Sequence, residues 1–177
     1  LSGIYHSRSH RGTVFRDISL TGLGWLYLTL PMLLMLLLSY KTGSYEGLLV
    51  LFLISLVWVN DTMAYVAGKT MGRHTLAYRL SPNKTWEGTI GGVLASAIGA
   101  AAWVMLDGID LMFGQAVISG LLIGIGAVLG DLLQSGLKRS VGWEDSGYLI
   151  PGHGGMLDRF DGLLISVPLC FPVLYFW

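Results

Sequence analysis

The sequence predicts an all-α integral membrane protein, a polytopic bundle of about five transmembrane helices. Three observations carry this prediction: 53% of the 177 residues are hydrophobic, only 12% are charged, and the apolar residues gather in five long runs. A membrane helix needs about 20 mostly apolar residues, and this composition is typical of membrane proteins rather than of soluble domains. We therefore expect residues 1–177 to form a single transmembrane domain.

The predicted spans follow one another with polar connections between them. In chain order they cover residues 22–40, 47–66, 88–106, 111–134 and 162–177. Pro31 can kink the first span, because proline removes a backbone hydrogen-bond donor. The third and fourth spans are joined by the short acidic segment 107–110, which indicates a tight helical hairpin.

The third and fourth spans carry small residues at four-residue spacing, which places them on one helix face. They are Gly88, Gly92, Ser96 and Ala100 in the third span, and Gly120, Gly124, Gly126 and Gly130 in the fourth. Small residues in this pattern favour close pairing of membrane helices. We assign them a structural role rather than a catalytic one.

The basic residues predict the orientation of the bundle. With five spans, every Lys and Arg except Lys41 falls on one side of the membrane, namely Arg8, Arg11, Arg16, Lys69, Arg73, Arg79, Lys84, Lys138, Arg139 and Arg159. The positive-inside rule makes that side cytoplasmic. Because the chain begins at Leu1 without a Met or a signal-peptide pattern, we also expect it to lack upstream spans.

A cluster of ionisable residues lies between the last two spans. More than a third of the charged side chains are at Asp131 or within residues 135–161. Ionisable groups at a bilayer boundary are costly, so such a cluster is a functional-site hypothesis by default. The alternative is an ordinary solvated loop between two helices.

The fourth span, continued as a helix, places Asp131, Ser135 and Lys138 on one face, with Arg139 beside them. An anion, a hydroxyl and two cations in this arrangement suit a metal ion with its phosphate ligands. The alternative is a helix-end ion pair among Asp131, Lys138 and Arg139, which would contribute little stability.

The glycine-rich segment 151–155 cannot form a regular helix and exposes backbone N–H groups. A turn of this kind before a helix favours anion binding. The helix that follows opens with Asp158, Arg159 and Asp161, and its carboxylates suit Mg²⁺. No Cys/His set with zinc spacing is present, so zinc is not expected. His153 is either a phosphate donor or merely a loop side chain.

The other cytoplasmic loop begins inside a span with Asn60 and Asp61. An unpaired carboxylate there is expensive, so Asp61 either faces the site or pairs with a basic residue inside the bundle. Residues 81–88, SPNKTWEG, combine a turn with a helix start and leave Lys84 free to reach a phosphate. Their alternative role is a helix cap with Trp86 as an interfacial anchor. Anionic lipid head groups are an alternative partner for Lys69, Arg73 and His74.

These motifs resemble those of the phosphatidate cytidylyltransferases, also called CDP-diacylglycerol synthases. The segment from Ser135 to Asp161, with its PGHGG and DRFD stretches, resembles the signature of that family. SPNKTWEG resembles its S-P-x-K-T-W-E-G element, and Asp61-Thr62 resembles its D-T-x-A-Y element. The resemblance covers residues 60 to 161, which would be the catalytic core.

The resemblance implies a reaction of CTP with phosphatidic acid that gives CDP-diacylglycerol and pyrophosphate, with Mg²⁺ as cofactor. The implied metal ligands are Asp131 and Asp158, with Asp61 as a further candidate. The implied catalytic residues are Lys138, Arg139, Asp145, Arg159 and Asp161. The implied substrate contacts are Ser81, Lys84, Thr85, Glu87, Ser135, His153, Gly154 and Gly155.

Two positions depart from the family pattern. Glu144 stands where the family usually carries Lys, and Gln134 stands where it commonly carries Glu. If the family Lys contacts a substrate phosphate, Glu144 would repel that phosphate. The two exchanges compensate in charge only if the two side chains touch.

Three other functions compete with a cytidylyltransferase. They are a CTP-dependent polyprenol or dolichol kinase, a catalytically silent lipid-binding paralogue, and an ion-coupled transporter using Asp61 and Asp131. The polar motifs lie on one side of the membrane, which argues against a transport pathway. The expected partners are CTP, phosphatidic acid, the lipid bilayer and a second copy in a homodimer. Zero net charge gives no reason to expect nucleic acid. We expect the protein in the bacterial cytoplasmic (inner) membrane, with its site facing the cytosol.

Overall fold

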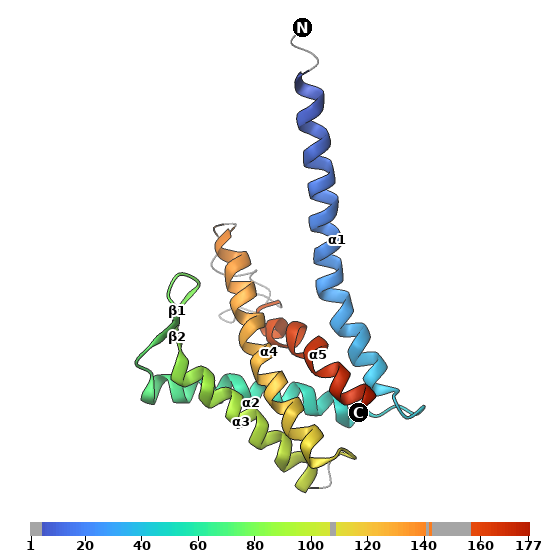
Figure 1. The fold of residues 1–177 in the computed structure, drawn as a ribbon, viewed down its shortest axis with the longest axis vertical. Helices are drawn as coiled ribbons and strands as arrows, with labels where there is room; N and C mark the ends of the chain where they lie inside the picture. The colour runs from blue at the N-terminus through green and yellow to red at the C-terminus, as the bar shows by residue number, and fades with distance from the viewer. Residues whose placement is uncertain (1–4, 107–108, 141, 143–156) are drawn as a thin grey trace.

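The computed structural model describes residues 5–106, 109–140, 142 and 157–177. Its elements, in chain order, are α1 (Tyr5–Ser39), α2 (Gly47–Met71), β1 (Thr75–Ala77), β2 (Ser81–Thr85), α3 (Trp86–Met105), α4 (Phe113–Ser140) and α5 (Leu157–Phe176) (Figure 1). All five helices are long and apolar enough to cross a membrane. The predicted helical membrane bundle is therefore confirmed.

Four helices continue well beyond the apolar runs that predicted them, and all four extensions carry polar residues. α1 begins at Tyr5, α2 runs on to Met71, α4 runs on to Ser140, and α5 begins at Leu157. A run of apolar residues marks where a helix suits lipid, whereas backbone hydrogen bonds continue into polar sequence. The extension of α4 confirms that Asp131, Ser135 and Lys138 lie on one continuous helix.

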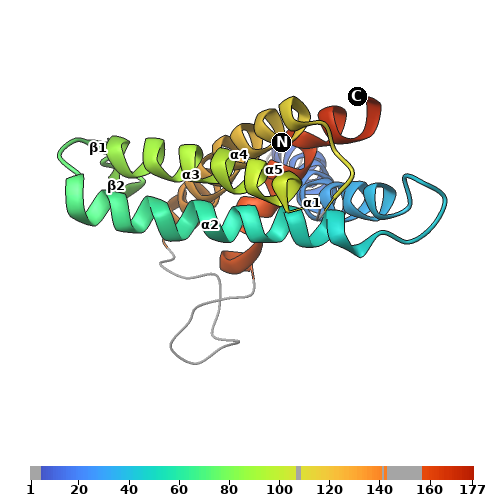
Figure 2. The same ribbon diagram turned by 90° about the horizontal axis from the view of Figure 1, so that it is seen from below.

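The small residues of α3 and α4 form the closest helix contacts, as predicted. A β-carbon built on Gly92 would lie 2.7 Å from the carbonyl oxygen of Asn60 in α2, and one on Gly120 would lie 2.7 Å from that of Ser96 in α3. Side chains at these glycines would force the helices apart. α2 and α3 run side by side in both views (Figures 1 and 2).

A second glycine seam joins α4 to α5. A β-carbon on Gly126 would lie 2.5 Å from the α-carbon of Ser166, and one on Gly130 would overlap the carbonyl oxygen of Asp161. The Ser166 hydroxyl donates a 2.8 Å hydrogen bond to the carbonyl oxygen of Ile123 across this seam. The seam therefore fixes how close the acidic start of α5 comes to Asp131.

At the end of the bundle away from Asp131, two side chains cap the C-terminus of α5. Lys41 Nζ donates to the carbonyl oxygen of Leu174 at 2.7 Å, and Gln115 Nε2 donates to that of Val173 at 3.0 Å. The last carbonyls of a helix lack partners within it, and a cation is favoured beside them. Lys41, the only basic residue on its predicted side, thus has a structural role.

α1 extends away from the other helices over most of its length and meets α5 near its C-terminal end (Figure 1). Only 6% of the most apolar stretch of α1, within Val14–Ser39, is buried, against 44% of the corresponding stretch of α4. The exposed leucines of α1 suit lipid, because acyl chains solvate apolar side chains as well as a protein core does.

The hairpin of β1 and β2 was not predicted. Its strands are antiparallel, with Thr75 opposite Thr85 and Ala77 opposite Ser81. Leu80 in the turn lies close to α4, since its Cδ2 would be 3.7 Å from a β-carbon built on Gly136. The hairpin therefore leads the chain from the end of α2 across to α4 and back to the start of α3.

Candidate functional site

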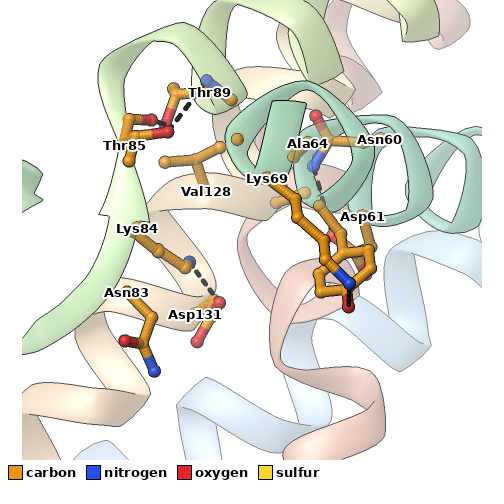
Figure 3. Close-up of a pocket in the computed structure, with 14 residues that line it drawn as sticks. Asn60, Asp61, Ala64, Lys69, Asn83, Lys84, Thr85, Thr89, Val128 and Asp131 are labelled. Carbon is orange, nitrogen blue, oxygen red and sulfur yellow. Dashed lines mark hydrogen bonds and ion pairs between the residues drawn. The ribbon is translucent and has the colours of Figure 1, made fainter. Parts of the chain in front are cut away.

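A cavity of about 490 Å³ opens between α2, β2, α3 and α4, where the hairpin adjoins the helices (Figure 3). Small residues, among them Ala64, Gly68 and Gly88, make room for it. Its polar and ionisable lining includes Asn60, Asp61, Tyr65, Lys69, Lys84 and Asp131.

An ion pair between Lys84 and Asp131 crosses the cavity (Figure 3). β2 delivers the lysine and α4 delivers the aspartate, whose other carboxylate oxygen accepts a 3.3 Å hydrogen bond from Ser135. Their side chains are 25% and 41% exposed, so solvent and ligands can still reach the pair. The prediction that Asp131 and Ser135 share a face is confirmed.

Acidic side chains outnumber lysines around this pair. Asp161, at the start of α5, interacts electrostatically with Asp131, with Asp61 and with Lys84. Asp61 in turn interacts with Asp131 and with Lys84. Three carboxylates therefore share the field of Lys84, and Lys69 is the other lysine in the cavity lining. This surplus of negative charge favours the binding of a further cation.

Asn60 holds Asp61 in place from within the bundle. It is only 1% exposed, and its Nδ2 donates to Asp61 Oδ1 at 3.2 Å. Its own Oδ1 is buried, has no hydrogen-bond partner among the described residues, and lies between Gly92 and Gly124, at 2.8 Å and 3.3 Å from β-carbons built there. Among the two roles predicted for Asp61, the structure supports the one in which it faces the site.

A second polar cluster joins the ends of α4 and α5. Asp158 Oδ1 accepts hydrogen bonds from Lys138 Nζ at 2.9 Å and from Gln134 Nε2 at 2.8 Å. Gln134 is 2% exposed, so its amide holds the carboxylate from a buried position. The alternative considered for Lys138 was an ion pair with Asp131, but Lys138 pairs with Asp158 in α5, and Asp131 pairs with Lys84.

Glu87 contacts the loop that precedes the hairpin. Its Oε2 accepts from the backbone N–H groups of Arg73 and His74, at 3.1 Å and 3.3 Å, and its Oε1 lies 2.6 Å from His74 Nδ1. Thr85 caps α3 by accepting a 3.2 Å hydrogen bond from the N–H of Gly88. Both residues hold β2 against α3, and with it Lys84.

The sequence model of the Cytidylyltransferase family matches residues 4–177, nearly the whole chain. The chain belongs to the cytidylyltransferase family. Proteins named phosphatidate cytidylyltransferase are among its relatives. One from Staphylococcus saprophyticus is 39% identical over 154 residues, which are 86% of this chain and 55% of the relative. One from Staphylococcus aureus is 46% identical over 133 residues, 73% of this chain and 50% of the relative. The chain spans about half the length of the curated relatives that it matches.

In this cytidylyltransferase chain, the predicted site residues separate into groups. Lys84, Thr85 and Asp131 line the cavity. Ser135 and Asp161 adjoin it through Asp131, Lys138 and Asp158 form the second cluster, and Glu87 faces the 73–74 loop. Ser81 lies in β2, and Arg139 and Arg159 lie in the terminal turns of α4 and α5. Outside the described residues are Glu144, Asp145, His153, Gly154 and Gly155.

The two expected metal ligands of the cytidylyltransferase chain lie in different clusters, Asp131 with Lys84 and Asp158 with Lys138. Among the described residues, no three His, Cys, Asp or Glu side chains are grouped to hold a metal ion by themselves. Mg²⁺ usually takes one or two carboxylates and completes its shell with water and substrate phosphates. The carboxylate oxygens here lie where negative charge is in surplus. They would therefore suit a Mg²⁺ ion that takes its remaining ligands from water and the substrate.

Sequence reasoning missed that Asn60 and Tyr65 belong to the cavity, and it offered only lipid head groups as a partner for Lys69. The signal was present, since Asp61, Tyr65 and Lys69 are four residues apart and share one helix face. The apolar run ended at residue 66, which placed Lys69 in a loop. The continuation of α2 to Met71 places Lys69 on the cavity wall.

Proposed function

We propose that this protein transfers the cytidylyl group of CTP to phosphatidic acid, giving CDP-diacylglycerol and pyrophosphate. The observation that carries the proposal is the cavity in which Lys84 meets Asp131, a polar site set into membrane-crossing helices. The names of the staphylococcal relatives support the same reaction. A polar reaction among apolar helices suits a substrate with one phosphate group and two acyl chains.

The chemistry needs little from the protein besides positioning and charge neutralisation. A phosphate oxygen of phosphatidic acid bonds to the α-phosphorus of CTP, and the bond from that phosphorus to the bridging β-phosphate oxygen breaks. Pyrophosphate leaves with the electron pair. The attacking phosphate is already ionised at neutral pH, so no general base is required. Alignment of two anions is then the main task, as in other phosphoryl transfers.

The described side chains can divide this task. Lys84, in the cavity, would contact a phosphate oxygen once a substrate competes for it with Asp131. Lys138 would serve the triphosphate from the second cluster, beside Asp158. Asp131 and Asp158 would hold Mg²⁺, with Asp61 as a further candidate. A magnesium ion bound there would neutralise phosphate charge and polarise the α-phosphate.

The site would face the cytosol at the bacterial inner membrane. The hairpin, the end of α4 and the start of α5 all lie at the cavity end of the bundle, and they carry Arg79, Lys84, Lys138 and Arg159. Basic residues near helix ends favour the cytoplasmic side. CTP is available there, and the bacterial relatives support this location.

The test is an assay of the purified protein in detergent with labelled CTP, phosphatidic acid and Mg²⁺. We expect CDP-diacylglycerol, and we expect Asp131→Asn to lower its rate at least 100-fold, the usual effect of removing a key electrostatic group. Asp110→Asn, an exposed carboxylate at the other end of the bundle, is the matched control and should keep the activity.

Other outcomes would contradict the proposal. A phosphorylated polyprenol, formed from CTP in place of the CDP-lipid, would identify a kinase. Absence of any product from the native protein, with activity gained by Glu144→Lys, would identify a catalytically silent paralogue.

A further inference from the structure

A second lysine lies on the cavity wall, and no described carboxylate forms an ion pair with it. Lys69, in the last turn of α2, lines the cavity with an exposed side chain. Lys84 pairs with Asp131, and Lys138 pairs with Asp158. Within the described part of the chain, by contrast, no carboxylate forms an ion pair with Lys69. This ammonium group is therefore available to an anionic ligand.

The neighbour of Lys69 is an aromatic hydroxyl on the same helix face. Lys69 Nζ lies 3.5 Å from the Tyr65 hydroxyl and 5.6 Å from the centroid of the Tyr65 ring. Both contacts are long and solvent-exposed, so a phosphate oxygen can replace them. An ammonium group and a phenolic O–H side by side are two donors for one phosphate group.

The face that carries this pair continues into the apolar surface of α2. Trp58 and Tyr65 are seven residues apart, lie on one side of the helix and are each 66% exposed. Val66, one turn before Lys69, is 44% exposed. Exposed apolar side chains on a membrane-crossing helix suit acyl chains. Along α2, a lipid-compatible surface thus leads directly to the ammonium group of Lys69.

The same face also leads into the site. Lys69 lies on the same side of α2 as Asp61, opposite the Lys84–Asp131 pair (Figure 3). We propose that Lys69 and Tyr65 receive the phosphate group of the lipid substrate where the cavity meets the membrane, with the acyl chains lying along α2. This inference rests on the proposed function for the identity of the lipid, a phosphate monoester with two acyl chains.

A kinetic experiment separates lipid recognition from nucleotide recognition. Phosphatidic acid is titrated in mixed micelles at saturating CTP, and CTP is then titrated at saturating phosphatidic acid. Lys69→Gln should raise KM for phosphatidic acid about tenfold, the size expected for one charge-assisted hydrogen bond. KM for CTP and kcat should change less than twofold. Lys69→Arg should restore most of the lipid affinity, and Tyr65→Phe should lose a smaller part of it.

The matched control is Arg79→Gln, which removes one positive charge from the exposed hairpin turn, outside the cavity lining. It shows how much lipid affinity comes from general attraction of anionic lipid to a basic surface. An equal rise in KM for phosphatidic acid in Arg79→Gln and Lys69→Gln would overturn the inference. A rise in KM for CTP, with the lipid KM unchanged, would assign Lys69 to the nucleotide and would also overturn it.

A binding measurement keeps this inference distinct from the proposed function. Fluorescent phosphatidic acid is titrated into the native protein, Lys69→Gln and Lys69→Arg, without CTP. Weaker binding by Lys69→Gln alone supports the lipid site even in a protein that forms no CDP-lipid, so the activity can fail while the site stands. Equal binding by all three proteins, or no binding by any, overturns the site whatever the activity.

Discussion

Gln134 makes a contact that a glutamate could not make. Its side-chain N–H donates to Asp158, and it is buried beside an ion pair that already contains one lysine and one carboxylate. A glutamate at position 134 would bring a second carboxylate against Asp158 in place of a hydrogen-bond donor. The amide therefore suits this chain locally, whatever the more common residue in similar proteins.

We expect Gln134→Glu to lower stability by about 2 kcal/mol, because it replaces a hydrogen bond to a charged group by a repulsion. Thermal unfolding in detergent measures this change. Gln134→Met, which removes the hydrogen bond without adding charge, should have a smaller effect. A stability of Gln134→Glu equal to the native value would show that the Asp158 contact contributes nothing.

The residues at the centre of the site could be predicted, whereas those at its edge could not. Asp131, Ser135 and Lys84 are polar residues in distinctive motifs beside apolar runs, so the sequence marks them. Asn60, Tyr65 and Lys69 belong to the site only through the rotation of α2 about its axis, which depends on its packing against α3. The partner of Lys138 was missed for a similar reason, since it comes from another helix.

At the scale of elements, glycines decide how the helices meet. The seam between α4 and α5 is so close that Gly126 and Gly130 touch backbone atoms of the partner helix. Lipid provides no hydrophobic drive for helix association, so such close packing carries much of the stability of a membrane bundle. The same seam sets the separation of the Asp131 and Asp158 clusters.

We expect Gly126→Leu to destabilise the bundle by about 3 kcal/mol or more and to abolish activity, because its side chain would overlap the backbone at Ser166. Unfolding by denaturing detergent measures the stability. Gly24→Leu is the control, since a β-carbon built on Gly24 in α1 would meet no described atom within 4 Å besides the neighbouring backbone of its own helix. Similar losses in both variants would argue against the seam.

The hairpin shows where element prediction from sequence fails. β1 and β2 have three and five residues, without an apolar alternation that would indicate strands. Their pairing depends on distant anchors, including the contacts of Glu87 with Arg73 and His74. The start of α3 could be predicted, because Thr85 and the apolar run after it form a local helix signal.

The whole molecule exposes many apolar side chains, which the membrane must cover. The spans predicted from apolar runs all exist, because any helical membrane segment must satisfy its backbone hydrogen bonds internally. Orientation follows from charge alone and remains a prediction. The orientation can be tested by labelling introduced cysteines, because the single native cysteine, Cys170, is fully buried.

Cysteines introduced at exposed positions can report the orientation. We expect a membrane-impermeant maleimide to label Thr42→Cys in intact cells. Arg79→Cys should be labelled only after the membrane is permeabilised. The native protein, with Cys170 alone, should remain unlabelled in both conditions and serves as the control. The reverse labelling pattern would place the cavity outside the cytosol.

The two borders of the cavity have a consequence for the order of substrate binding. On one side the cavity is bounded by the hairpin, a short polar sheet, and on the other by α2, a helix with apolar residues on its surface. In the proposed reaction, the water-soluble nucleotide would enter past the first border and the membrane lipid past the second. Neither substrate has to wait for the other, so the proposed reaction would follow random-order kinetics. Its two products would separate in the same way, pyrophosphate into water and the nucleotide lipid into the bilayer.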